Sequence, residues 1–182
     1  MYLSKGLLLR KTQNTIIVTH CGAEHELLGE RAVIWENGHQ GPRVSNQNQI
    51  LHELSKSGLA ETSNGSGNEA IYRILINCAI CPAKKPAFPV LWSRPERRMY
   101  KWITKAGLQL TIAELVFLNQ NKVKPTCRLL GEKNRQALTE TTYTTETIPD
   151  GILESQMERS PERDSTINTV MGLLSKDKVF FI

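Results

Sequence analysis

No apolar run in this chain of 182 residues approaches the roughly 18 residues that a membrane-spanning helix needs. The opening MYLSKGLLLRKTQ is interrupted by Arg10 and Lys11 too early to be typical of a signal peptide. Aromatic residues make up only 6% of the chain, but 40% of the residues are hydrophobic and 23% are charged, which is ordinary for a sequence that folds. We therefore expect a cytoplasmic protein with a hydrophobic core and no membrane partner.

Cysteine is also sparse, because four residues in this length cannot form a disulfide scaffold. Cys78 and Cys81 form a CxxC pair, and His20, Cys21 and His25 could complete a tetrahedral zinc site. However, the pair ends a β-type run, in which residues three apart face opposite sides of a strand. The pattern favours thiols without a metal, and it indicates no cofactor.

Motifs of the common enzyme classes are missing, namely HExxH, GxSxG, the P-loop and GxGxxG. Cys127 lies where a helix is expected to begin, but all four histidines lie in the first half of the chain. A cysteine nucleophile would need a histidine from that half as its base. The sequence therefore favours a protein that is not an enzyme.

Short segments of β-forming residues open the chain, and we expect three strands at 7–10, 15–19 and 25–29. The run ERAVIWENG, residues 30–38, predicts a short helix around an apolar centre. We expect this helix to stop at Gly38, because glycine adopts the left-handed conformation without strain.

Ser45 is placed to cap a second helix over 47–59, in which leucines and isoleucine recur at helical spacing. The pattern then changes to a period of two over 71–78, after a glycine-rich tip at 64–68. In this run Ile71, Arg73, Leu75 and Asn77 alternate with Tyr72, Ile74, Ile76 and Cys78. A helix followed by such a β-hairpin is typical of a winged helix, and the hairpin would be its wing.

The stretch CPAKKPAFP, with three prolines, predicts a stiff connector. Beyond it we expect helices over 95–107, 111–120, 126–143, 148–159 and from Pro161 onwards, and a final strand in KVFFI. The segments ILHELSKSGLAE and VMGLLSKDKVFF form an imperfect internal repeat, here called the internal echo, in which an apolar helix, LSK, a turn and a strand follow one another. This similarity is consistent with two related units or with chance similarity of helix-to-strand junctions. The sequence therefore predicts an α+β protein of tandem winged-helix-like domains, mostly helical with small antiparallel hairpins. The first domain is expected over 1–82, the linker over 83–92 and the second domain over 93–182.

Positive charge is concentrated in the middle of the chain. The net charge is +2 over 1–93, +7 over 94–135 and −4 over 136–182. The middle segment could bind nucleic-acid phosphates, or it could be an ordinary solvated face. Its candidate nucleic-acid-binding residues are Arg94, Arg97, Arg98, Lys101, Lys105, Lys124, Arg128 and Arg135.

Taken together, the segments GLLLRKTQNTIIVTH, HELLG, ERAVIWENG and QILHELSKSGLAET resemble the RiPP recognition element. This is the small winged-helix domain of the peptide chaperone in pyrroloquinoline quinone biosynthesis. The resemblance covers about residues 5–62. It departs from the family where HQGPRVS replaces a short helix, and it implies a domain that binds a peptide.

We expect a recognition module in which an extended peptide or protein segment adds to an exposed sheet edge beside a helix. The alternative is a transcriptional regulator that uses its second domain to bind duplex DNA. The sequence leaves open which strand is the free edge and whether the chain forms a homodimer. The predicted peptide-binding residues are Thr15, Ile17 and Thr19 on a strand and Gln49, His52 and Lys56 on the helix.

Overall fold

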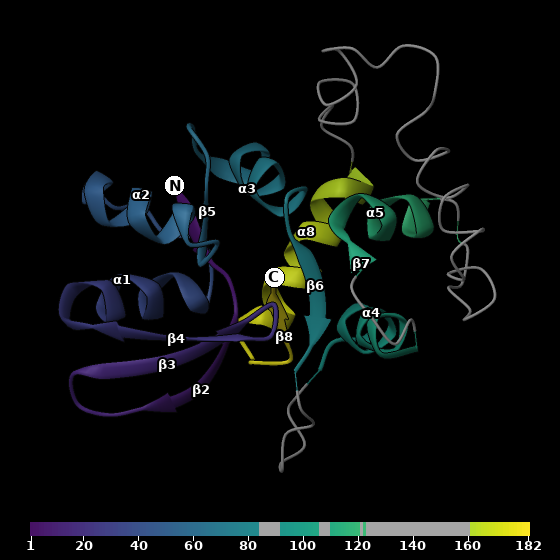
Figure 1. Ribbon diagram of the computed structural model, residues 1–182. Helices are drawn as coiled ribbons and strands as arrows, with labels where there is room; N and C mark the ends of the chain where they lie inside the picture. Colours follow the sequence, from purple (N-terminus) through teal and green to yellow (C-terminus); the bar gives the residue numbers. More distant parts are fainter. Residues whose placement is uncertain (84–91, 106–109, 121, 123–160) are drawn as a thin grey trace.

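The computed structural model describes residues 1–83, 92–105, 110–120, 122 and 161–182, which pack around two hydrophobic cores (Figure 1). Strands and helices both contribute to each core, as expected for an α+β protein, and the sheets are small and antiparallel. Among the described helices, none is long and apolar enough to cross a membrane.

The first core lies between a three-stranded meander and the helices that follow it. The meander has the order β2-β3-β4, and its buried Ile16, Val18 and Leu27 pack with Trp35. The three strands agree with those expected from the sequence. The elements of this part are β2 (Leu7–Lys11), β3 (Thr15–His20), β4 (Ala23–Leu28), α1 (Gly29–His39) and α2 (Asn48–Lys56).

The second core lies around a sheet of order β7-β6-β8, with α8 packed against α4 and α5. Buried Ile80, Ile103, Leu115 and Ile167 come from four of its elements. These elements are α3 (Gly67–Leu75), β6 (Ala79–Pro82), α4 (Arg94–Lys105), β7 (Leu110–Thr111), α5 (Ile112–Gln120), α8 (Pro161–Leu174) and β8 (Val179–Phe181).

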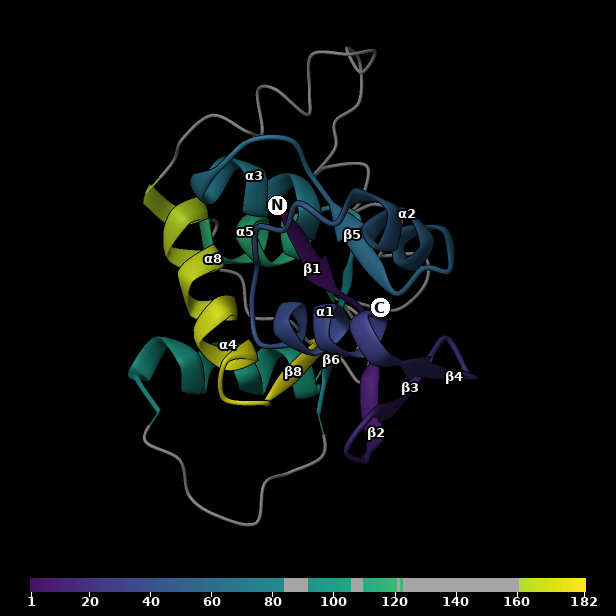
Figure 2. The ribbon, with the colours of Figure 1, turned by 90° about the vertical axis from the view of Figure 1, so that its left-hand side faces the viewer.

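The two cores share a strand, β1 (Tyr2–Ser4), which pairs with β5 (Ala60–Thr62) in the middle of the molecule (Figure 2). Successive side chains of a strand point to opposite sides. Tyr2 therefore belongs to the first core and Leu3 to the second. The sequence analysis predicted no strand here.

The expected wing over 60–78 is wrong beyond β5, because residues 67–75 form the helix α3. Nearly every position from Ala70 to Ile76 carries an apolar or aromatic group, so both the strand period and the helix period fit this run. The contacts of α3 with α8 select the helix, and Ala70, Ile74 and Cys78, spaced four apart, are buried.

The boundary expected at 83–92 also needs correction. Strand β6, which was assigned to the first domain, pairs with β7 on one side and β8 on the other. The two cores divide between β5 and α3, about twenty residues earlier. The sequence of a short strand does not specify which strand it pairs with, because tertiary packing selects the partner. The proline-rich stretch therefore indicated the wrong position for the domain boundary. Residues 84–91 of the linker lie outside the described ranges.

Both segments of the internal echo form a helix, a turn and a strand, α2 to β5 and α8 to β8. Each helix ends in a hydrogen bond from an N–H to the carbonyl five residues earlier, from Leu59 to Leu54 and from Lys178 to Leu173. The left-handed residue of each turn is Gly58 or Asp177. Strand β8 pairs within its own chain, with β6.

Some helix boundaries follow the sequence and two do not. Ser45 does not cap α2, because the N-cap is Gln47, whose N–H donates to the Ser45 hydroxyl at 3.1 Å. The helix expected from residue 111 is α5, where Thr111 and Glu114 form a capping box, and α8 begins at Pro161 as expected. Gly38, however, lies inside α1, where an added Cβ would come within 2.5 Å of the Ser4 hydroxyl. This glycine therefore allows β1 to approach the helix. The helices predicted over 126–143 and 148–159 lie outside the described residues.

Candidate functional site

The hairpin of β3 and β4 determines which backbone groups of the meander face outward. Its two-residue turn, Cys21 and Gly22, has positive φ angles of 50° and 85°, as in the tight turns typical of hairpins. His20 pairs with Ala23 across this turn. Two-residue turns close with a hydrogen-bonded pair, and the pairs then alternate along the strands.

This alternation leaves the N–H and C=O groups of Glu24 and Glu26 and the N–H of Leu28 pointing away from β3, because each residue lies in a non-hydrogen-bonded pair. The Leu28 carbonyl belongs to the N-cap of α1 and accepts the first hydrogen bond of that helix. Within the described ranges, no strand pairs with this side of β4. Strand β4 therefore presents a regular row of backbone donors and acceptors.

The other edge strand, β2, is less regular. A bulge between Leu8 and Arg10 shifts its register against β3. Bulges disrupt an edge and increase its twist, and proteins use them to discourage further pairing. The regular edge is thus β4, which answers the question that the sequence left open.

Side chains on β4 differ between its two faces. Leu27 is buried and His25 is half-buried on the face that α1 covers, while Glu24 and Glu26 are exposed on the open face. Leu28, at the end of β4, is 58% exposed, so the row ends at an uncovered apolar group. An incoming strand would meet the two carboxylates and Leu28 on the open face, and His25 and Leu27 on the other.

The residues predicted for peptide binding are not brought together as expected. Thr15, Ile17 and Thr19 lie on β3, the central strand, so they cannot form an edge. Gln49, His52 and Lys56 are exposed on α2, but α1 lies between α2 and the meander (Figure 1). The prediction chose the wrong strand because a meander's central strand and edge strands have similar compositions.

The predicted nucleic-acid-binding residues are described only in part. Arg94, Arg97 and Lys101 are exposed on α4. Arg98 is also exposed, and its guanidinium donates to Asn119 Oδ1 at 2.8 Å and lies 5.4 Å from the Trp102 ring. Outside the described part lie the Lys105 side chain and all of Lys124, Arg128 and Arg135.

Glu96 lies among these basic residues in the sequence, but its side chain is buried and bound to other groups. Its carboxylate accepts the Ser93 N–H at 2.7 Å and the Lys176 ammonium at 2.5 Å, and its own N–H donates to the Ser93 hydroxyl. Burial alone would raise the pKa of this carboxyl, but the hydrogen bonds from Lys176 and Ser93 lower it. The S-x-x-E spacing from Ser93 was a capping signal that the sequence analysis missed.

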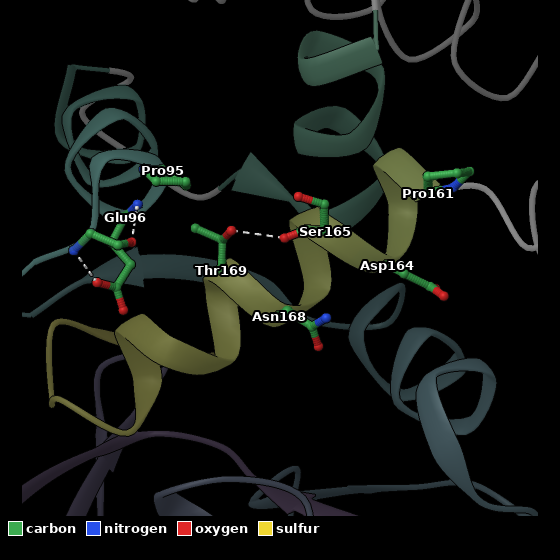
Figure 3. Close-up of a pocket in the computed structure, with 8 residues that line it drawn as sticks. Pro95, Glu96, Pro161, Asp164, Ser165, Asn168 and Thr169 are labelled. Carbon is green, nitrogen blue, oxygen red and sulfur yellow. Dashed lines mark hydrogen bonds between the residues drawn. The ribbon is translucent and has the colours of Figure 1, made fainter.

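A wide hollow of about 480 Å³ lies between the start of α4 and the outer face of α8 (Figure 3). Pro95 and Glu96 come from one side, and Asp164, Asn168 and Thr169 from the other. Glu96 is already bound, and the Thr169 hydroxyl donates to the Ser165 carbonyl at 2.8 Å. The hollow thus offers few uncommitted groups that converge on a ligand.

The three thiols that the structure describes show no arrangement for metal binding or catalysis, and Cys127 lies outside the described ranges. Cys78 and Cys81 are both buried, and the Cys78 thiol donates to the Ile74 carbonyl. Burial raises the pKa of Cys78 to about 12. Cys21 is exposed, with its sulfur 3.7 Å from Nε2 of His20. Throughout the described part, no three His, Cys, Asp or Glu residues form a group that could hold a metal ion.

Comparisons of the chain with protein families, with curated proteins and with solved structures found no match. The assignment of a function therefore depends on the geometry of the surfaces described above.

Proposed function

We propose that the protein is a non-enzymatic recognition module that binds an extended peptide or protein segment as an added strand along β4. The observation that carries this proposal is the row of outward N–H and C=O groups at Glu24 and Glu26, continued by the Leu28 N–H, on an edge without a bulge. Main-chain hydrogen bonds to such an edge provide affinity, and alternate side chains provide specificity.

The order of elements in the first core supports this role. The three meander strands β2, β3 and β4 lead directly into α1, and a leucine-rich α2 ends before Gly58, as in the RiPP recognition element; β1 is an additional strand ahead of them. Residues 40–47 contain no helix, in keeping with the departure noted in the sequence. We infer that both cores are winged-helix-like, since α2 leads to β5 and α8 leads to β8 through the same kind of turn.

The side chains of β4 favour a basic ligand. Glu24 and Glu26 alternate along the open face, and opposite charges on neighbouring strands stabilise pairing. An added strand with lysine or arginine at alternate positions would place these side chains beside the two carboxylates.

Proline substitution tests the backbone contribution directly. Glu26→Pro removes an outward N–H, which an edge strand tolerates, whereas Glu26→Ala removes the same carboxylate but keeps that N–H. Peptides selected from a random phage-displayed library on the intact protein should bind Glu26→Ala and lose binding to Glu26→Pro. Equal binding by a folded Glu26→Pro variant would contradict the proposal.

Nucleic-acid binding is the second candidate, because the exposed face of α4 is basic and Glu96 turns away from it. Arg94, Arg97 and Lys101 could contact successive phosphates of duplex DNA. Binding of this kind weakens steeply as salt concentration rises.

A charge-matched comparison tests this candidate. Alanine at Arg94, Arg97 and Lys101 together should reduce retention of duplex DNA and lower its salt dependence. Alanine at Arg10, Lys56 and Arg73 removes the same charge from other surfaces and should have a smaller effect. If both triple variants lose retention equally, the interaction is a general charge effect.

A further inference from the structure

A second, more enclosed cavity of about 240 Å³ lies where the two cores meet, away from the β4 edge. Its lining comes from β2, from the end of α1 and from the turn and strand after α8. Residues distant in the sequence thus form one cavity. The residues that matter for its chemistry are Leu7, Leu8, Glu36, His39, Asp177 and Phe180.

A single backbone contact explains the position of this cavity. The Gly6 N–H donates to the Phe181 carbonyl at 2.6 Å, which brings the start of β2 to the outer edge of β8. The cavity is lined by the next residues of both strands, including Leu8 and Phe180. Apolar side chains of two strands therefore form two of its walls.

The remaining lining carries negative charge. Asp177 has no ion-pair partner among the described residues, and Glu36 pairs with Lys11 at the exposed surface. The helix α1 ends at His39, and the last carbonyls of a helix carry partial negative charge. Glu36 is shared with Lys11, so the uncompensated carboxylate beside the apolar walls and the end of α1 is that of Asp177.

The ring of His39 lies within this charged group. It stacks on Trp35 with ring centroids 4.5 Å apart. Burial lowers the pKa of His39, while the nearby carboxylates of Asp177 and Glu36 oppose this effect. The pKa of the His39 imidazole should therefore respond to any charge that enters the cavity.

We propose that this cavity binds the side chain of a lysine or arginine from a peptide or protein partner. The aliphatic stem would lie between Leu8 and Phe180, and the cationic group would lie at Asp177 and Glu36. Charge complementarity selects this occupant, because the cavity is a locally negative site on a protein with a net charge of +5. Long basic side chains bury their stems on apolar surface while their charge contacts polar groups.

This proposal does not depend on strand addition at β4, and its test uses probes too short to form a strand. The probe is Nα-acetyl-lysine amide, and Nα-acetyl-norleucine amide is the neutral control of similar shape. Titration into the ¹⁵N-labelled full chain should shift the amide signals of Leu7, Leu8 and Asp177 in a saturable manner. The norleucine derivative should bind several-fold more weakly, because it cannot form an ion pair with the exposed carboxylate of Asp177.

Asp177→Asn is the informative variant, because asparagine tolerates the left-handed conformation of this position, where φ is 51°. It should weaken binding of the lysine derivative several-fold, whereas Glu24→Gln on β4 should leave it unchanged. Binding should also lower the pKa of His39 further, which ring-proton NMR can follow. Equal shifts from norleucine, unchanged binding by a folded Asp177→Asn, or displacement of the probe by millimolar Ca²⁺ would each overturn the proposal.

Discussion

The Gly6 N–H donates to the Phe181 carbonyl, joining the first turn of the chain to its last strand at 2.6 Å. Gly6 has a φ of 104°, in the region that favours glycine. An added Cβ would lie 2.6 Å from Val18 Cγ1 and 2.9 Å from the Thr19 carbonyl. Backbone conformation and space therefore both require glycine at the contact between the two cores.

Gly6→Ala should lower the free energy of unfolding by about 2–4 kcal/mol, the sum of backbone strain and overpacking. Gly22→Ala is a matched control, since φ there is 85° but no atom lies within 4 Å of an added Cβ. It should lose only the strain component, about 1 kcal/mol. Urea unfolding measures both, and equal losses would show that packing against Val18 does not matter.

Leu3→Ala should destabilise the second core although Leu3 is near the N-terminus. Leu3 is fully buried there, and removing a buried leucine side chain lowers stability by about 2–5 kcal/mol. Hydrogen exchange should show reduced protection at Ile80 and Phe181. Leu9→Ala, at a position 48% exposed, should change little. Unchanged protection of β6 in Leu3→Ala would contradict a core shared through β1.

Glu96→Gln should remove a pH-dependent part of the stability. The pKa of Glu96 in the folded protein lies below its ordinary value of 4.5. Its contribution is therefore complete above about pH 4.5 and is lost as pH falls through the folded-state pKa. At pH 7 the variant should be less stable by about 1–3 kcal/mol, and this difference should shrink in acid.

Urea unfolding across this pH range tests that prediction. Glu69→Gln is the control, because Glu69 pairs with Arg73 on an exposed helix surface and should contribute little. A constant difference between the wild type and Glu96→Gln from pH 7 to pH 3 would show that the carboxylate charge is not involved.

Alkylation should distinguish the thiols of the described part of the chain. Cys21 is exposed, whereas burial raises the pKa of Cys78 to about 12. Only the thiolate is nucleophilic, so iodoacetamide at pH 8 should label Cys21 first and Cys78 only after unfolding. Mass spectrometry of digested samples measures both rates. Comparable labelling of the two sites in the native protein would show that Cys78 is accessible.

Local patterns predicted the parts of the fold that depend on neighbouring residues. Strand β3 alternates half-buried and buried residues over Thr15–Val18, and the Thr111–Glu114 capping box involves groups only three residues apart. The same local rule would have found Ser93 and Glu96. Glu96 also forms an ion pair with Lys176, and this contact has no local sequence signature because it joins residues 80 positions apart.

The sequence by itself thus determined the α+β class, the three strands of the meander and most helix starts, because capping and side-chain periodicity act over a few residues. Only the tertiary structure decided that 67–75 is a helix, that β3 is central and that β6 joins β7 and β8. In each case local preferences were nearly balanced, and burial against distant elements selected one conformation. The candidate edge and the cavity at Asp177 both follow from that long-range pairing.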